Sequence, residues 1–93
     1  DKSLSIGDDS FAQINKVYIQ NNIKKNNAKA EIVVKNSSIA DIKNVKIYTN
    51  NICIAAYRKS NFYHGSKIIL DKKNYFCSGK GYYEHGDSIV SLK

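Results

Sequence analysis

The chain has 93 residues, two cysteines and a formal net charge of +7. This length supports one hydrophobic core and excludes a second domain, and the longest apolar run, residues 52–56, is far shorter than the ~20 residues of a membrane-spanning helix. The chain starts at Asp1 and contains no methionine, which indicates a processed N-terminus from which a signal peptide has been removed.

The elements predicted along the chain are short strands separated by polar turns. Residues 1–10 form a flexible polar leader, in which Leu4 and Ile6 make at most a brief edge pairing. Asparagine, serine and glycine supply the turns that follow, and the longest polar connection is residues 58–66. Alternating apolar and polar residues predict strands over residues 11–20, 28–35, 45–48, 52–57, 67–70, 75–77, 82–84 and 88–92.

Two segments give the clearest patterns. In residues 28–35, Ile32 and Val34 alternate with Glu31 and Lys35, which predicts a strand with one buried and one solvated face. Residues 45–48 and 52–57 read as a hairpin that turns at residues 50–51, and the second strand is apolar on both faces, which is typical of a central strand. Turns at intervals of about 8–12 residues and the lack of a helical period predict an all-β fold: an antiparallel β-sandwich or small barrel of seven or eight strands, formed by residues 11–93.

Cysteine spacing points to the compartment. Cys53 and Cys77 lie 24 positions apart, and in a small basic chain they are expected to form one disulfide, which implies secretion. The alternatives are two buried thiols in a cytosolic protein or a zinc site with His64 and His85. The sequence order of these four residues lacks the closely spaced pairs of a structural zinc site, so no metal or other cofactor is predicted.

The positive charge has two interpretations. A basic surface binds phosphates, which would favour nucleic acid as a partner. However, lysine, asparagine and isoleucine make up 38 of the 93 residues, and arginine occurs once, at Arg58. That composition is typical of an AT-rich genome, and nucleic-acid readers favour arginine over lysine.

Catalytic motifs are weak. A small secreted ribonuclease could use His64, Glu84 or His85 for general acid–base work, with Arg58 or Lys59 on the phosphate. Both histidines precede glycines in turns, and no nucleophile elbow, paired carboxylates or phosphate-binding glycine loop appears. The chain is therefore predicted not to be an enzyme.

Aromatic residues are the better candidates for binding. Exposed rings stack on sugar faces and anchor protein interfaces, whereas tyrosines within strands, such as Tyr48, Tyr57 and Tyr75, together with Phe76, are expected to be half-buried structural residues. The predicted ligand-binding residues are the aromatic residues of the longest loop and of the last turn, with a rim of lysines: Phe62, Tyr63, Tyr82, Tyr83, Lys59, Lys67 and Lys80. The triplet at Asn36 is an acceptor sequence for N-glycosylation.

Two secreted plant families share short patterns with this chain. The stretch AKAEIVVKNSSIADIKNV, residues 28–45, resembles the cellulose-binding modules at the C-terminus of some plant endoglucanases. The run IKNVKIYTNN with the later Cys77 and SGKGYYEHGDSIVS is similar to tapetum-determinant-like proteins. The first family relies on tryptophans and the second on further cysteines that are missing here, so neither resemblance transfers ligand residues.

Both resemblances imply a secreted β-sandwich that binds rather than catalyses. The predicted function is a monomeric, secreted, non-catalytic module, an effector or toxin in one interpretation, that recognises an extracellular polysaccharide, glycan or receptor protein. The alternative is a basic secreted ribonuclease or nucleic-acid-binding protein.

Overall fold

The fold consists almost entirely of short strands. In the computed structural model the described residues are 3–21 and 30–93. None of their helices is long and apolar enough to cross a membrane. One short 3-10 helix, η1 (Lys72–Asn74), accompanies eleven strands: β1 (Leu4–Gly7), β2 (Phe11–Ile14), β3 (Val17–Asn21), β4 (Ala30–Lys35), β5 (Ile39–Ile42), β6 (Val45–Thr49), β7 (Ile52–Tyr57), β8 (Lys67–Leu70), β9 (Tyr75–Cys77), β10 (Lys80–Glu84) and β11 (Ile89–Leu92).

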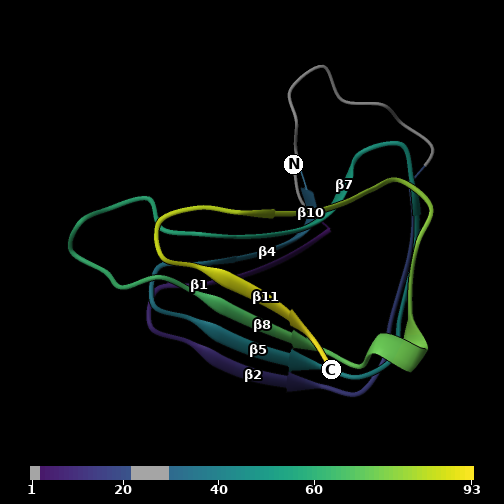
Figure 1. The fold of residues 1–93 in the computed structure, drawn as a ribbon, viewed down its shortest axis with the longest axis horizontal. Helices are drawn as coiled ribbons and strands as arrows, with labels where there is room; N and C mark the ends of the chain where they lie inside the picture. The colour runs from purple at the N-terminus through teal and green to yellow at the C-terminus, as the bar shows by residue number, and fades with distance from the viewer. Residues whose placement is uncertain (1–2, 22–29) are drawn as a thin grey trace.

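The strands form three parallel sheets that the chain visits in turn. Sheet A has the order β1-β4-β7-β10, sheet B the order β11-β8-β5-β2 and sheet C the order β3-β6-β9. Each circuit of the three sheets is a rung: rung 1 contains β1 to β3, rung 2 β4 to β6, rung 3 β7 to β9, and rung 4 β10 and β11. Figure 1 shows the strands of sheet B lying side by side and pointing the same way. The molecule is therefore a three-sided parallel β-solenoid.

This architecture corrects the predicted antiparallel sandwich. Every described strand pairing is parallel, and β6 and β7, the predicted hairpin, belong to different sheets. Parallel strands need a long crossover between them, which is usually a helix. Here the crossover is made of the other two strands of the rung. The alternation of side chains identified the strands, but it carries no information about which strand each one pairs with.

Strand positions were predicted better than strand partners. The segment 52–57 is confirmed as β7, a central strand between β4 and β10. The segment 11–20 is two strands, β2 and β3, which turn a corner at Asn15 and Lys16. Strand β5 was not predicted, and residues 22–29, including the start of the 28–35 strand, lie outside the described residues.

A spacing of 28 residues relates all three strands of rung 1 to those of rung 2, and it recurs between β5 and β8 and between β7 and β10. Ser10 and Ser38, like Ser38 and Ser66, lie 28 positions apart at the corner between sheets A and B. The backbone N–H of Ser10 donates to Ser38 Oγ at 3.2 Å, Ser38 N–H to Ser66 Oγ at 3.4 Å, and Ser66 N–H to Ser88 Oγ at 2.9 Å. We call this series the serine ladder. It gives each of these three backbone N–H groups an acceptor in the next rung, as backbone polar groups inside a fold require.

The core fills the space between the three sheets. Its fully buried members come from inward positions of all three, and neighbouring rungs place them above one another, as Ile32 on Ile54 and Ile42 on Leu70. The predicted Cys53–Cys77 disulfide is present and joins β7 in sheet A to β9 in sheet C within rung 3. It therefore ties two sides of one rung together.

A buried carboxylate occupies the corner between sheets C and A. Glu31, expected on a solvated face, is 3% exposed and accepts hydrogen bonds from Ser3, Asn21, Thr49 and Asn51 at 2.7–3.3 Å. Burial alone would raise the pKa of Glu31, but these four donors outweigh it and hold the pKa below its ordinary value. The cluster connects residues of rungs 1 and 2.

Candidate functional site

The outer face of sheet C carries a row of three aromatic side chains. Tyr18 on β3, Tyr48 on β6 and Phe76 on β9 are 59%, 39% and 45% exposed. The ring centroids of Tyr18 and Tyr48 are 5.9 Å apart, and those of Tyr48 and Phe76 are 5.2 Å apart. We call these three residues the aromatic row. One ring from each of rungs 1 to 3 thus forms a continuous apolar surface across the sheet.

Strand alternation explains why these rings point outward. Val45 and Ile47 of β6 are fully buried in the core, so Lys46 and Tyr48 between and after them face solvent. The parallel register then aligns Tyr18, Lys46 and Phe76 across the three strands. Because each strand is hydrogen-bonded to its neighbour, the outward side chains are presented by a rigid backbone.

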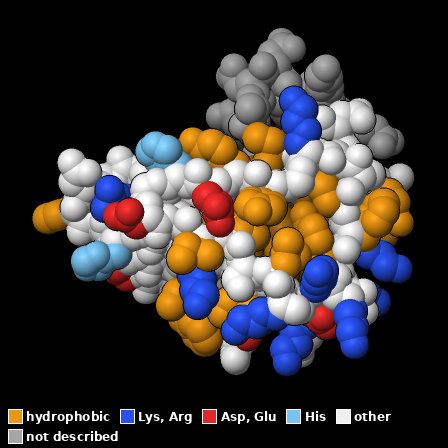
Figure 2. All heavy atoms as spheres, viewed as in Figure 1, with side chains coloured by type: hydrophobic (Ala, Val, Ile, Leu, Met, Phe, Trp, Pro, Cys, Tyr) orange, Lys and Arg blue, Asp and Glu red, His pale blue; other side chains and the backbone are white. Residues whose placement is uncertain are grey.

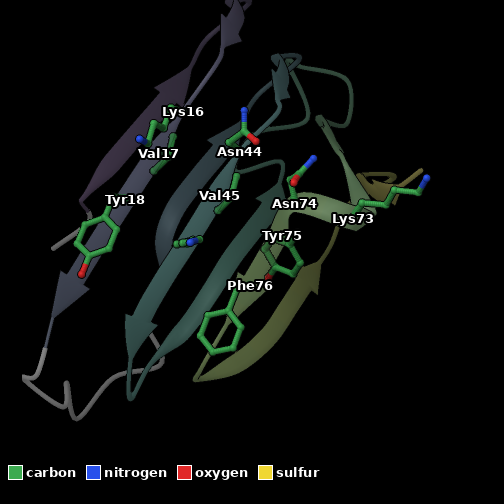
Figure 3. Close-up of a pocket in the computed structure, with 10 residues that line it drawn as sticks. Lys16, Val17, Tyr18, Asn44, Val45, Lys73, Asn74, Tyr75 and Phe76 are labelled. Carbon is green, nitrogen blue, oxygen red and sulfur yellow. The ribbon is translucent and has the colours of Figure 1, made fainter.

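A groove of about 550 Å³ lies beside the row, over the first residues of the same three strands. Figure 3 shows Tyr18 and Phe76 on one side of it, with Lys16, Asn44, Asn74 and Lys73 following the starts of the strands. The groove is lined by Lys16, Val17, Tyr18, Asn44, Val45, Lys46, Lys73, Asn74, Tyr75 and Phe76. Rungs 1 to 3 each contribute one lysine, and no carboxylate of the described residues belongs to the lining.

Local hydrogen bonds fix the backbone at the groove. Asn44 Nδ2 donates to the carbonyl oxygen of Asn15 at 2.8 Å, and the N–H of Val17 donates to the carbonyl oxygen of Asn44 at 2.7 Å. In rung 3, Asp71 caps η1 by accepting from the N–H of Lys73 at 3.1 Å and from Asn74 Nδ2 at 2.7 Å. Lys16 and Lys73 therefore project from ordered corners, and Lys46 projects from strand β6.

Tyr75 forms part of the groove floor. Its ring packs against the core, and burial raises the pKa of its hydroxyl. That hydroxyl is buried and has no hydrogen-bond partner within residues 3–21 and 30–93. It is a polar group that contributes a cost to folding rather than a contact for a ligand.

The predicted ligand residues are distributed over several surfaces. Phe62, which is 92% exposed, and Tyr63 occupy the 58–66 loop, with ring centroids 6.3 Å apart. Tyr83 lies on β10 in sheet A, where its ring stacks on His85 with a centroid distance of 6.2 Å. The remaining predicted residues are Lys59 in the loop, Lys67 on β8 in sheet B, and Lys80 and Tyr82 on β10. The structure does not gather them around one groove.

The residues proposed for a ribonuclease have structural contacts of their own. Glu84 accepts a hydrogen bond from the N–H of Val90 at 2.7 Å, and Arg58 lies 3.7 Å from the carboxylate of Asp87. His64 is tied to Ser37 through its backbone N–H at 2.6 Å. Within the described parts of the chain no group of three or more His, Cys, Asp or Glu side chains could hold a metal ion.

Asn36, the predicted glycan acceptor, lies inside the corner between sheets A and B. Its amide donates to Asp8 Oδ1 at 2.9 Å and accepts from the N–H of Lys59 at 2.8 Å. The side chain is buried and its backbone has φ 56°, a left-handed conformation that asparagine tolerates. Modification of Asn36 would require this corner to open.

Comparison with protein-family models, with curated proteins and with solved structures finds no match to the chain. The resemblances to cellulose-binding modules and tapetum-determinant-like proteins therefore stay predictions.

The aromatic row was missed because Tyr48 and Phe76 were assigned structural roles as strand residues. The signal that could have found it is the 28-residue repeat, which is visible in Ser10, Ser38 and Ser66. Applied to Tyr18, that repeat leads to Lys46, two residues from Tyr48 on the same face of β6.

Proposed function

We propose that the protein is a secreted, non-catalytic binding module that recognises an extracellular glycan through the outer face of sheet C. The observation that carries this proposal is the aromatic row, because three exposed rings from successive rungs form one platform. The axial C–H groups of a sugar are attracted to the negative face of such rings. The Cys53–Cys77 disulfide supports secretion.

The platform is also pre-organised for binding. The rings contact one another, with interplanar angles of 50° and 43°, so each restricts the rotation of its neighbour. Little side-chain freedom is then lost when a ligand binds. Adjacent strands are about 4.8 Å apart, so a chain of pyranose rings that crosses the strands meets a new aromatic side chain at each rung.

Binding to insoluble and soluble glycans tests the proposal. The wild type is compared with Tyr48→Ala, which removes the central ring of the row, and with two control variants, Tyr83→Ala and Phe62→Ala, which remove exposed rings elsewhere. We expect Tyr48→Ala to weaken binding about tenfold, since stacking of an aromatic ring contributes up to about 1.5 kcal/mol. Tyr83→Ala and Phe62→Ala should bind as the wild type does.

Two outcomes would contradict the proposal. If no glycan binds at high protein concentration, the module has another class of ligand. If Phe62→Ala or Tyr83→Ala abolishes binding and Tyr48→Ala does not, the glycan site lies on the loop or on sheet A. Circular dichroism of each variant shows that a loss of binding does not reflect unfolding.

A further inference from the structure

We propose that the glycan bound by sheet C is acidic, a polysaccharide whose sugars carry carboxylate or sulfate groups; this inference rests on the function proposed above. The supporting observation is the placement of Lys16, Lys46 and Lys73. All three are exposed and line the groove beside the aromatic row. Figure 2 shows basic side chains gathered around the corner that carries η1.

These lysines are available to an anion. Within the described residues, the one ion pair joins Arg58 to Asp87, at another corner of the solenoid. The nearest carboxylate in sequence to Lys73 is Asp71, whose oxygens face the backbone of η1 and the side chain of Asn74. Among the residues that the structure describes, the ammonium groups of the groove therefore have no carboxylate partner.

The lysines also repeat with the rungs. Lys16 precedes β3 in rung 1, Lys46 lies in β6 of rung 2, and Lys73 precedes β9 in rung 3. Successive rungs are separated by about 4.8 Å, so positive charge recurs along the solenoid axis at roughly the length of one sugar. Lys46 is level with Tyr18 and Phe76 in the register, whereas Lys16 and Lys73 precede them. A polymer with one acidic group per sugar, lying across the strands, would place its rings on the aromatic row and its anions within reach of these lysines.

Single-stranded nucleic acid is the other polymer with regular negative charge, and the geometry favours it less. Its binding proteins present rings on which separate bases stack. The centroid distances of 5.9 Å and 5.2 Å leave no space for a base between neighbouring rings of the row. The groove contains no arginine, the residue that matches phosphate with two parallel hydrogen bonds.

Pairs of glycans that differ only in charge test the inference. Polygalacturonate is compared with its fully methyl-esterified form, and dextran sulfate with dextran, by titration at ~0.05 M and ~0.5 M salt. Single-stranded RNA is titrated in parallel. The variants are Lys46→Gln, the control Lys67→Gln, which removes an exposed charge from sheet B, and Tyr48→Ala.

We expect at least one acidic polymer to bind about tenfold more tightly than its neutral counterpart at low salt, with the preference reduced at high salt. Lys46→Gln should weaken acidic binding about three- to fivefold, as expected for loss of one partly solvated ion pair, and Lys67→Gln should leave it unchanged. Tyr48→Ala should weaken binding to acidic and neutral glycans alike. The acidic polymer that binds more tightly identifies the preferred anion, carboxylate for polygalacturonate or sulfate for dextran sulfate.

The possible failures are distinguishable. Equal binding of the neutral counterparts would overturn the inference and leave the proposed glycan function intact. An equal loss in Lys46→Gln and Lys67→Gln would show that net charge, not the groove, attracts the polymer, and would also overturn it. RNA binding that is tighter than glycan binding and depends on Tyr48 would assign the groove to nucleic acid. Failure of all glycans to bind would refute both proposals.

Discussion

The replacement Glu31→Gln should destabilise the protein by about 2–3 kcal/mol, because it changes a buried carboxylate that satisfies four donors. A glutamine keeps the size of the side chain but has one acceptor oxygen instead of two. If that oxygen takes the place of Oε2, it retains the bonds from Thr49 and Asn51, which are 2.7 Å and 3.1 Å long. The amide NH₂ group then faces Ser3 and Asn21, and at least one donor loses its acceptor.

The magnitude follows from these bonds. A hydrogen bond to a charged group contributes about 1.5–3 kcal/mol, and a buried donor left without an acceptor costs about 1–3 kcal/mol. The hydroxyl of Ser3 can rotate to accept a hydrogen bond from the new amide. The expected decrease in the free energy of unfolding is therefore about 2–3 kcal/mol, below the sum of the two contributions. In a domain of this size, 2–3 kcal/mol corresponds to a decrease in the melting temperature of roughly 10–20 °C.

The pH dependence provides an independent readout. The pKa of Glu31 in the folded protein lies below its ordinary value of 4.5, so the folded state binds the proton less readily than the unfolded chain does. Its contribution to the free energy of unfolding is therefore fully present above pH 4.5 and is lost as the pH falls through the folded pKa. The difference between wild type and Glu31→Gln should shrink in that acidic window.

Urea unfolding followed by circular dichroism, at neutral pH and at a series of acidic pH values, measures both effects. The matched control is Glu84→Gln, because exposed Glu84 accepts one hydrogen bond from the backbone, that of the Val90 N–H, at the last rung. We expect the control to lose less than about 1 kcal/mol. An equal effect of the two substitutions, or a Glu31→Gln difference that does not change with pH, would refute the assigned role of the buried cluster.

Three further substitutions test the solenoid itself. Replacing Cys53 and Cys77 together with alanine should lower the free energy of unfolding by about 3.5 kcal/mol, the chain-entropy value for a loop of this length, and denaturation midpoints with and without reductant give the same comparison. Tyr75→Phe should leave melting unchanged or raise it, because it removes a buried hydroxyl without a described partner; a clear decrease would show that the hydroxyl is hydrogen-bonded. Gly79→Ala should destabilise the protein strongly, because the added Cβ would collide with a backbone carbonyl oxygen. The control Gly81→Ala, with no atom within 4 Å of the added carbon, should have little effect on stability. Similar melting curves of the two variants would contradict this packing.

The sequence was sufficient to predict strands and the disulfide but not their arrangement. The two apolar faces of residues 52–57 identify β7 as a buried central strand, and that prediction is confirmed. In residues 28–35, the alternation placed Glu31 on a solvated face, where the structure buries it, because its partners Asn21 and Thr49 come from strands of another sheet, sheet C. Pairing partners depend on contacts between residues far apart in sequence, and short polar turns are common to hairpins and to solenoid corners.

The candidate site shows the same limit. Phe62 was predicted as a ligand residue because it lies in the longest loop, and the structure confirms that it is exposed. Tyr48 and Phe76 looked like ordinary strand residues, and their importance arises only when the rungs bring them within 5.2 Å of each other. The residue pattern of a single strand does not predict a surface that forms when rungs stack. Such a surface can be predicted only when the sequence repeat is recognised first.

The serine ladder has a consequence for cooperativity. Each of its bonds joins one rung to the next, and the strand pairings likewise connect only neighbouring rungs. Stability in such an array is a sum of local terms and interfaces, so opening can begin at an end and stop at an interior rung. Rungs 2 and 3 each have a neighbour on both sides, and rung 3 also contains the disulfide. Amide hydrogen exchange should therefore be slowest in β4 and β7 and become faster outward, a gradient of protection along the axis rather than one uniform value.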